Sequence, residues 1–363
     1  MKRQANFEIL RTVSMLMIVC FHFFTYALKF VSNPAVSEFG GEANYPVLQY
    51  IAILSSLGVN LFVLISSYFL VDKPFKLYRL IKTWWQVVFT YMAILGIYSL
   101  SCHELISNDM ILQGLLPIHE NTYWFVTCYI GLLLLVPFLS HFVKSLSKRQ
   151  HQWLLLVLMV VFTNFSFGYP FGESMITNNG FSLVWFCVLF VYGAYVKIYG
   201  FSFETKIKIW HILVAGFIVF AIMSGKLYVK HMIWGNEMVY LMPTYNSLIF
   251  ILSLMVFVWF RNHQFDETNL FSRFCIICAP YTFGVYLIHD HPILKKVIWN
   301  SFNWADLIEN YSVFGVIILS VCSIFIICIL CDFVREVIFK VIRINDMIYY
   351  FSDRIEQKVI RNS

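Results

Sequence analysis

Long apolar runs separated by short polar loops cover most of the chain. Ten such runs occur, at residues 7–31, 45–71, 83–102, 122–143, 151–168, 181–197, 207–224, 239–260, 274–290 and 310–334. A helix needs about 20 apolar residues to cross the ~30 Å hydrocarbon core of a bilayer. The runs that begin at 151, 181, 207 and 274 are the short ones, and a re-entrant segment is an alternative for one of them. We predict an all-α integral membrane protein with about ten transmembrane helices.

The composition agrees with this prediction. Hydrophobic residues make up 60% of the 363 residues and charged residues only 13%, whereas an average soluble domain carries about 25% charged residues. The chain also contains 37 Phe, 21 Tyr and 10 Trp residues, which suit positions that face lipid and its two interfaces. The same figures exclude a disordered chain, because disorder requires low hydrophobicity and high charge.

The distribution of Lys and Arg orients the predicted helices. With ten spans and the N-terminus inside, 20 of the 26 basic residues fall on the cytoplasmic side. Arg11 lies within the first run, and five residues fall outside: Lys29, Lys226, Lys230, Lys295 and Lys296. Because basic residues are enriched on the cytoplasmic side, we predict that both termini are cytoplasmic. The first run is too long for a signal peptide and contains Arg11 and His22, so we expect it to be retained.

We divide the chain into a transmembrane domain at residues 1–334 and a basic amphipathic cytoplasmic tail at residues 335–363. Val337, Ile338 and Val341 lie among basic residues in this tail, a pattern typical of a helix on the inner leaflet. A plain extension of the last helix is the alternative.

The nine cysteines lie mostly inside apolar runs, as small buried hydrophobes do. Two C-x-x-C pairs occur, at Cys275/Cys278 and Cys328/Cys331. Their separation is much larger than the roughly 15–20 residues that separate the pairs of a zinc ribbon. We therefore expect helix packing at these positions and no metal.

Ionisable residues inside the predicted spans are candidates for function, because burying them in lipid costs at least ~2.5–3.5 kcal/mol each. Arg11 and His22 are separated by 11 residues, which brings them to within about 20° of one face of a helix. A shared inward-facing cavity would explain both residues. The alternatives are an interfacial anchor for Arg11 and a buried, hydrogen-bonded histidine for His22.

Three further polar groups stand out. Asn60 lies in the middle of the second run, where small residues such as Gly58 and Ser67 indicate close helix contact. Lys76 and Arg79 follow that run, either as a positive-inside signal or as a phosphate-binding patch. His289, Asp290 and His291 end the ninth run, as a base with its neighbours or as a helix end meeting water.

Several motifs together resemble acyltransferase family 3. NFEILRTVSMLMIVCFHF carries Arg11 and His22 in the R-x10-H arrangement of that family. Four later motifs of the family are resembled as well, in the same order. They are matched by LGVNLFVLISSYFL, the Lys76–Arg79 stretch, NTYWFVTCYIGLLLLVPFL and YTFGVYLIH. Asn60, Ser67 and Lys76 depart from the Asp, Gly and Arg that are frequent in the family, which indicates a subgroup.

The resemblance implies a ten-helix, multi-pass O-acyltransferase of the plasma (inner) membrane. Its acyl donor would be acetyl-CoA, and its acceptor a hydroxyl of a cell-surface polysaccharide, such as capsule or exopolysaccharide, or of a lipid-linked precursor. We expect no fused hydrolase-like domain after the last run, which favours these acceptors. We expect the bilayer, the glycan and glycan-assembly proteins as partners, and no nucleic acid.

The chemistry of acyl transfer assigns expected roles. His22 is expected to be the general base, because imidazole takes up a proton near neutral pH. Arg11, Lys76 and Arg79 are expected to bind the coenzyme A phosphates, with Arg11 also acting near the catalytic centre. Asn60, Tyr123, Trp124 and His289 are candidates for supporting or substrate contacts, and Glu120 and Asp290 are candidates for orienting His22. The alternatives are a transporter or flippase for a small anion or lipid-linked sugar, and a non-catalytic membrane scaffold.

Overall fold

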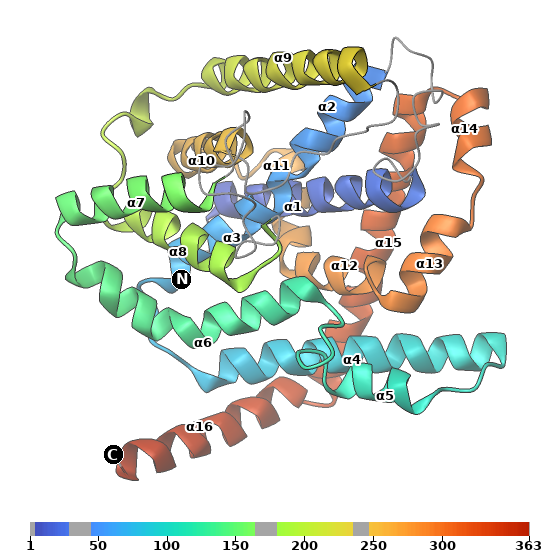
Figure 1. Cartoon of the computed structure of the whole chain (residues 1–363). Coiled ribbons are helices and arrows are strands. Elements are labelled where there is room, and N and C mark those ends of the chain that lie inside the picture. The colour runs from blue at the N-terminus through green and yellow to red at the C-terminus, as the bar shows by residue number, and fades with distance from the viewer. Residues whose placement is uncertain (1–3, 29–44, 164–179, 235–246, 363) are drawn as a thin grey trace.

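The computed structural model describes residues 4–28, 45–163, 180–234 and 247–362, and every regular element within these ranges is a helix. The N-terminal half contains α1 (Ala5–His22), the π-helical turn η1 (Phe23–Ala27), α2 (Tyr45–Ser55), α3 (Leu57–Leu70), α4 (Leu77–Cys102), α5 (Asn108–Leu115), α6 (Trp124–Ser145) and α7 (Lys148–Phe162). The C-terminal half contains α8 (Leu183–Ile198), η4 (Glu204–Lys206), α9 (Ile209–Trp234), α10 (Ser247–Asn262), α11 (Leu270–Cys278), η5 (Ala279–Tyr281), α12 (Thr282–His289), α13 (Pro292–Asn300), α14 (Trp304–Asn310), α15 (Val313–Val341) and α16 (Ile344–Asn362) (Figure 1).

Each predicted apolar run coincides with one of these helices or with consecutive helices. Within the described ranges, six stretches are long and apolar enough to cross a membrane: Ala5–Ala27, Val47–Leu70, Leu77–Cys102, Trp124–Ser145, Leu270–His289 and Val313–Val341. Shorter apolar helices are Leu183–Ile198, Ile209–Ile222 and Ser247–Asn262. The chain is thus an all-α, multi-pass membrane protein, while the count of ten spans and the cytoplasmic termini stay predictions. The expected run ends at 29–31, 164–168 and 239–246 lie outside the described residues, as does Lys29.

Helix α1 lies centrally among the other helices, where it packs against α3, α10, α11, α12 and α15 (Figure 1). Thr12 of α1 is buried and donates a hydrogen bond of 3.0 Å to the carbonyl oxygen of Cys275 in α11. Such a partner is required because a buried hydroxyl without one is costly. The α-helix changes to the π-helical turn η1 directly after His22, and π turns are frequent at functional sites.

Small residues bring α1, α3 and α8 into close contact. A Cβ atom at Gly58 of α3 would lie 2.6 Å from the backbone oxygen of Ser14 in α1, and one at Gly193 of α8 would lie 2.6 Å from Cβ of Ser67 in α3. Real Cβ atoms do not approach other atoms so closely, so a larger residue at either position would push the helices apart. The predicted role of small residues in close helix packing is therefore confirmed at these contacts.

The C-terminal residues form two helices. α15 continues through Asp332 and Arg335 to Val341, and α16 starts at Ile344 after Arg343, whose φ of 58° is left-handed. α16 packs against α4, where Glu356 accepts a hydrogen bond of 2.5 Å from the backbone N–H of Leu77. Contact of α16 with the inner leaflet stays a prediction.

Candidate active site

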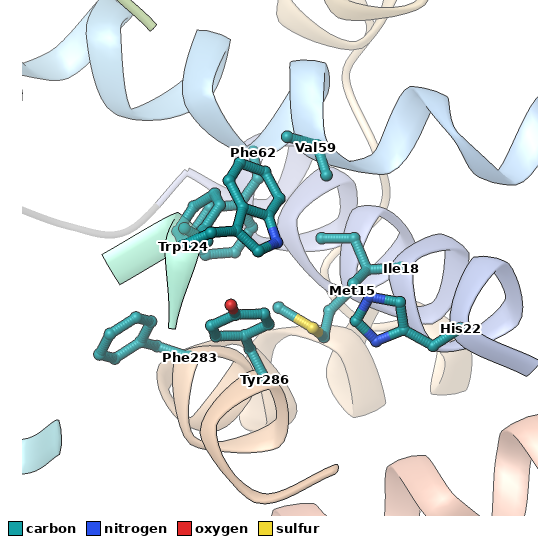
Figure 2. Close-up of a pocket in the computed structure, with 9 residues that line it drawn as sticks. Met15, Ile18, His22, Val59, Phe62, Trp124, Phe283 and Tyr286 are labelled. Atoms are coloured by element: carbon teal, nitrogen blue, oxygen red, sulfur yellow. The ribbon is translucent and has the colours of Figure 1, made fainter. Parts of the chain in front are cut away.

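A narrow pocket lies beside the second half of α1 (Figure 2). Its volume is about 10 Å³, roughly the space that one water molecule requires. The pocket is enclosed by side chains of α1, α3, α6 and α12, most of them apolar or aromatic: Met15, Ile18, His22, Val59, Phe62, Trp124, Phe125, Phe283 and Tyr286. His22 is therefore an imidazole at the edge of a small, largely apolar space.

His22 is held by a second histidine. His22 is 7% exposed and His289 of α12 is 0% exposed, and Nδ1 of His22 lies 2.9 Å from Nε2 of His289. Nδ1 of His289 lies 2.5 Å from the carbonyl oxygen of Val285. A carbonyl oxygen only accepts hydrogen bonds, so Nδ1 of His289 carries a proton and, in a neutral ring, Nε2 accepts one from His22. This hydrogen-bond network assigns Nε2 of His22 as the unprotonated nitrogen.

The pocket and Arg11 are connected along one face of α1. Arg11, Met15, Ile18 and His22 follow at spacings of four, three and four residues, which places them on one side of a continuous helix. The last three of these side chains line the pocket. Eleven residues of α-helix separate Arg11 from His22 by roughly 16 Å. The stripe therefore extends from the pocket toward the predicted cytoplasmic end of the helix.

Cationic side chains gather at the Arg11 end of α1. Arg11 is 28% exposed and forms an ion pair of 3.0 Å with Glu8. Burial and the positive charges of Arg79 and Arg11 lower the pKa of Lys73, which shows that the three cations lie within electrostatic reach of one another. Lys76 is the exposed N-cap residue of α4, just before Arg79. Of the predicted donor-binding residues, Arg11 and Arg79 are thus in this group, and Lys76 is an exposed residue three positions before Arg79.

Asn60 connects three helices. Its side chain is fully buried, its Oδ1 accepts a hydrogen bond of 3.0 Å from Nε1 of Trp185 in α8, and its Nδ2 donates one of 3.3 Å to Oγ of Ser253 in α10. These bonds satisfy the amide within the packed helices. They give Asn60 a clear structural role in joining α3 to α8 and α10.

Tyr123 and Trp124 stand at the start of α6. The hydroxyl of Tyr123 donates a hydrogen bond of 3.0 Å to the carbonyl oxygen of Leu287 in α12, so this tyrosine fixes the helix that carries His289. Trp124 lines the pocket itself. The structure therefore brings Trp124 and His22 to one cavity and places Tyr123 behind it.

The candidate carboxylates have other partners. Asp290 is buried, and its Oδ1 accepts hydrogen bonds from the hydroxyl of Tyr26 at 3.4 Å and from Nζ of Lys295 at 3.3 Å. Glu120 pairs with the exposed His119 at 2.8 Å. The hydrogen-bond partner of His22 is thus an imidazole rather than either of these carboxylates. Among the described residues, no group of three or more His, Cys, Asp or Glu side chains is arranged to hold a metal ion.

Tyr286 is a pocket residue that sequence reasoning missed. It lies three residues before His289 on α12 and lines the pocket opposite α1 (Figure 2). Two signals in the sequence pointed to it: Tyr286 lies inside the YTFGVYLIH stretch that resembles a family motif, and its spacing of three residues from His289 places both on one face of a helix. That spacing becomes informative once the pairing of His289 with His22 is known.

Comparison with known proteins adds the family. The family model described as an acyltransferase domain matches residues 4–333, which is most of the 363-residue chain. No curated protein and no solved structure matches the chain. The matched region includes every residue of the pocket and of the Arg11 end of α1. The chain therefore belongs to acyltransferase family 3 and is a membrane acyltransferase.

Proposed function

We propose that this acyltransferase moves an acetyl group from cytoplasmic acetyl-CoA to a hydroxyl of a cell-surface polysaccharide or of its lipid-linked precursor, in the plasma (inner) membrane. The observation that carries the proposal is the hydrogen-bonded series from Val285 through His289 to His22, which leaves an unprotonated nitrogen beside a largely apolar pocket. Acyl transfer to an alcohol needs such a base to remove the hydroxyl proton.

The donor enters from the Arg11 end of α1 in this proposal. Arg11 and Arg79, with the exposed Lys76, offer positive charge to the phosphates of coenzyme A. The pantetheine arm then follows the Arg11–His22 face of α1 toward the pocket. The roughly 16 Å between the two residues suits an extended arm that carries its thioester away from its phosphates.

The transfer step is direct. The acceptor oxygen attacks the thioester carbonyl carbon while its proton moves to Nε2 of His22. The tetrahedral intermediate then collapses, the carbon–sulfur bond breaks, and the thiolate takes the proton from the His22 imidazolium. The products are the acetyl ester and free coenzyme A, and the base is regenerated.

His22→Ala tests the proposal. The purified wild-type protein, given acetyl-CoA and a glycan acceptor, is expected to release free coenzyme A thiol and form an acetyl ester detectable by mass spectrometry. The variant should lose this activity by about 10²–10⁴-fold. His141→Ala is the matched control, because His141 is an exposed histidine of α6 outside the pocket.

Two results would contradict the proposal. Wild-type turnover by His22→Ala would remove the assigned base. A wild-type protein that transports an anion or a lipid-linked sugar without releasing coenzyme A would instead favour the transporter reading. Glycans from cells with and without the protein, compared for a missing acetyl ester, identify the acceptor.

A further inference from the structure

The hydroxyl of Tyr286 is buried in the pocket without a hydrogen-bond partner. Tyr286 is 3% exposed, and its hydroxyl is among the buried side-chain polar atoms that make no hydrogen bond within the described part of the chain. Figure 2 shows this hydroxyl pointing across the pocket toward Trp124, in the cavity that His22 also lines. An unpaired buried hydroxyl is costly and uncommon, so it calls for an explanation in terms of function.

The start of α6 lies beside the same space, because Trp124 and Phe125 line the pocket. This helix spans Trp124–Ser145, and its N-cap residue Tyr123 makes no side-chain cap. Instead, the Tyr123 hydroxyl donates to the carbonyl oxygen of Leu287. The first-turn amides of α6 therefore lack a capping side chain, at the helix end where the dipole is positive. The backbone N–H of Phe125 in this turn is directed at the Tyr286 oxygen, in a contact weaker than a full hydrogen bond.

We propose that the Tyr286 hydroxyl and the first turn of α6 together form the oxyanion subsite of the acyl-transfer reaction. This inference rests on the proposed function. When the acceptor oxygen adds to the thioester, the former carbonyl oxygen gains a negative charge. Tyr286 O–H and the α6 amides donate hydrogen bonds to that oxygen, and the positive end of the α6 dipole stabilises it. The charge returns to the carbon–oxygen bond as the thiolate leaves.

The arrangement divides the two catalytic tasks between opposite walls of one pocket. α1 supplies the base, while α12 and α6 supply the oxyanion donors. α12 serves both tasks, because Tyr286 and His289 lie three residues apart on it. The apolar side chains between these groups lower the local polarity, which strengthens each hydrogen bond to the developing charge.

Tyr286→Phe removes only the hydroxyl. We expect turnover to fall by about 10²–10³-fold, the usual effect of losing one oxyanion donor. The dissociation constant for acetyl-CoA and the thermal unfolding temperature should stay unchanged, because the lost hydroxyl bonds no protein group. The matched control is Tyr192→Phe in α8, whose buried hydroxyl donates a hydrogen bond of 2.6 Å to the carbonyl oxygen of Leu155 outside the pocket. This control should retain wild-type turnover.

The outcomes separate this inference from the proposed function. Turnover of Tyr286→Phe within twofold of wild type, beside an inactive His22→Ala, would overturn the oxyanion subsite and leave the acyl-transfer proposal standing. The oxyanion subsite would also be overturned if Tyr286→Phe lost turnover together with acetyl-CoA affinity or with thermal stability, since that pattern indicates a structural role. An active His22→Ala would overturn the proposed function itself.

Discussion

His22 and His289 form a direct imidazole–imidazole hydrogen bond of 2.9 Å that joins α1 to α12 across 267 residues of sequence. The bond requires Nε2 of His289 to be an acceptor, because Nδ1 of the same ring already donates to the Val285 carbonyl oxygen. A second proton on His289 would either place two N–H groups against each other or force His22 into the tautomer whose Nε2 is protonated. The pair therefore holds His22 as a base only while His289 is neutral.

His289 is expected to be a positioning residue for His22. His289→Ala should lower turnover by about 10²-fold or more, because an unheld imidazole is not kept in the tautomer and orientation that a general base needs. His289→Gln should retain more activity than His289→Ala, since its amide oxygen can accept from Nδ1 of His22. Acetyl-CoA turnover by the purified variants measures both effects.

The control for this prediction is His119→Ala, which removes an exposed histidine that pairs only with its neighbour Glu120. It should behave as wild type. Equal activity of His289→Ala and His289→Gln would show that the hydrogen bond to His22 is not what His289 contributes.

Arg11 is expected to act mainly on donor binding. Arg11→Ala should weaken the binding of coenzyme A by about ten- to a hundredfold, because a charge-assisted hydrogen bond contributes roughly 1.5–3 kcal/mol. Turnover at saturating acetyl-CoA should change less, since Arg11 lies roughly 16 Å from His22 along α1. Equilibrium binding of coenzyme A in detergent, repeated at rising salt, measures the effect.

Glu8→Gln is the matched control for Arg11, because it removes the ion-pair partner and keeps the arginine. Binding of the anionic donor should be as tight as in wild type or tighter. Unchanged coenzyme A affinity in Arg11→Ala would place the donor phosphates elsewhere.

Gly58→Ala should destabilise the protein and reduce its activity. The added Cβ would lie 2.6 Å from the backbone oxygen of Ser14 and 2.9 Å from the side chain of Ile18, which lines the pocket. Overpacking of this kind costs typically 1–3 kcal/mol. Gly96→Ala in α4 is the control, because nothing lies within 4 Å of its added Cβ. That change should be neutral or stabilising by up to about 1 kcal/mol. Thermal unfolding in detergent compares the two, and equal stability would contradict the close contact of α1 with α3.

His291 should make stability depend on pH. It lies just after the Leu270–His289 span, where burial lowers its pKa to about 4, and its Nδ1 accepts a hydrogen bond of 3.2 Å from the backbone N–H of Ile293 at the start of α13. Between pH ~6.5 and about 4 the unfolded chain binds a proton at this residue that the folded protein does not. The free energy of unfolding should therefore fall as pH is lowered through this window, by up to about 1.4 kcal/mol per pH unit.

His291→Asn keeps an N-cap acceptor and removes the titration. Its stability should fall less between pH 7 and pH 5 than that of wild type, as measured by denaturation at each pH. The same pH dependence in both proteins would show that the titration of His291 does not contribute to the pH dependence of stability.

Much of the architecture was open to prediction because it depends on local pattern. Apolar runs in a lipid environment must form helices, since every backbone polar group has to be satisfied within its own segment. Within the described residues, each predicted run accordingly appears as helix. The common face of Arg11 and His22 follows from helix periodicity alone, and the family follows from motifs that occur in a fixed order.

The partners of the polar groups depended on long-range packing, which periodicity does not encode. From the sequence, Asp290 was as reasonable a partner for His22 as His289, because both residues lie at the end of one run. In the structure, the orientation of α12 against α1 places His289 beside His22, whereas Asp290 contacts Tyr26 and Lys295. Tyr286 likewise becomes a candidate only from the tertiary structure, in which its buried hydroxyl lies between α6 and α12. A helix fixes which of its residues share a face, whereas contacts between helices fix what that face meets.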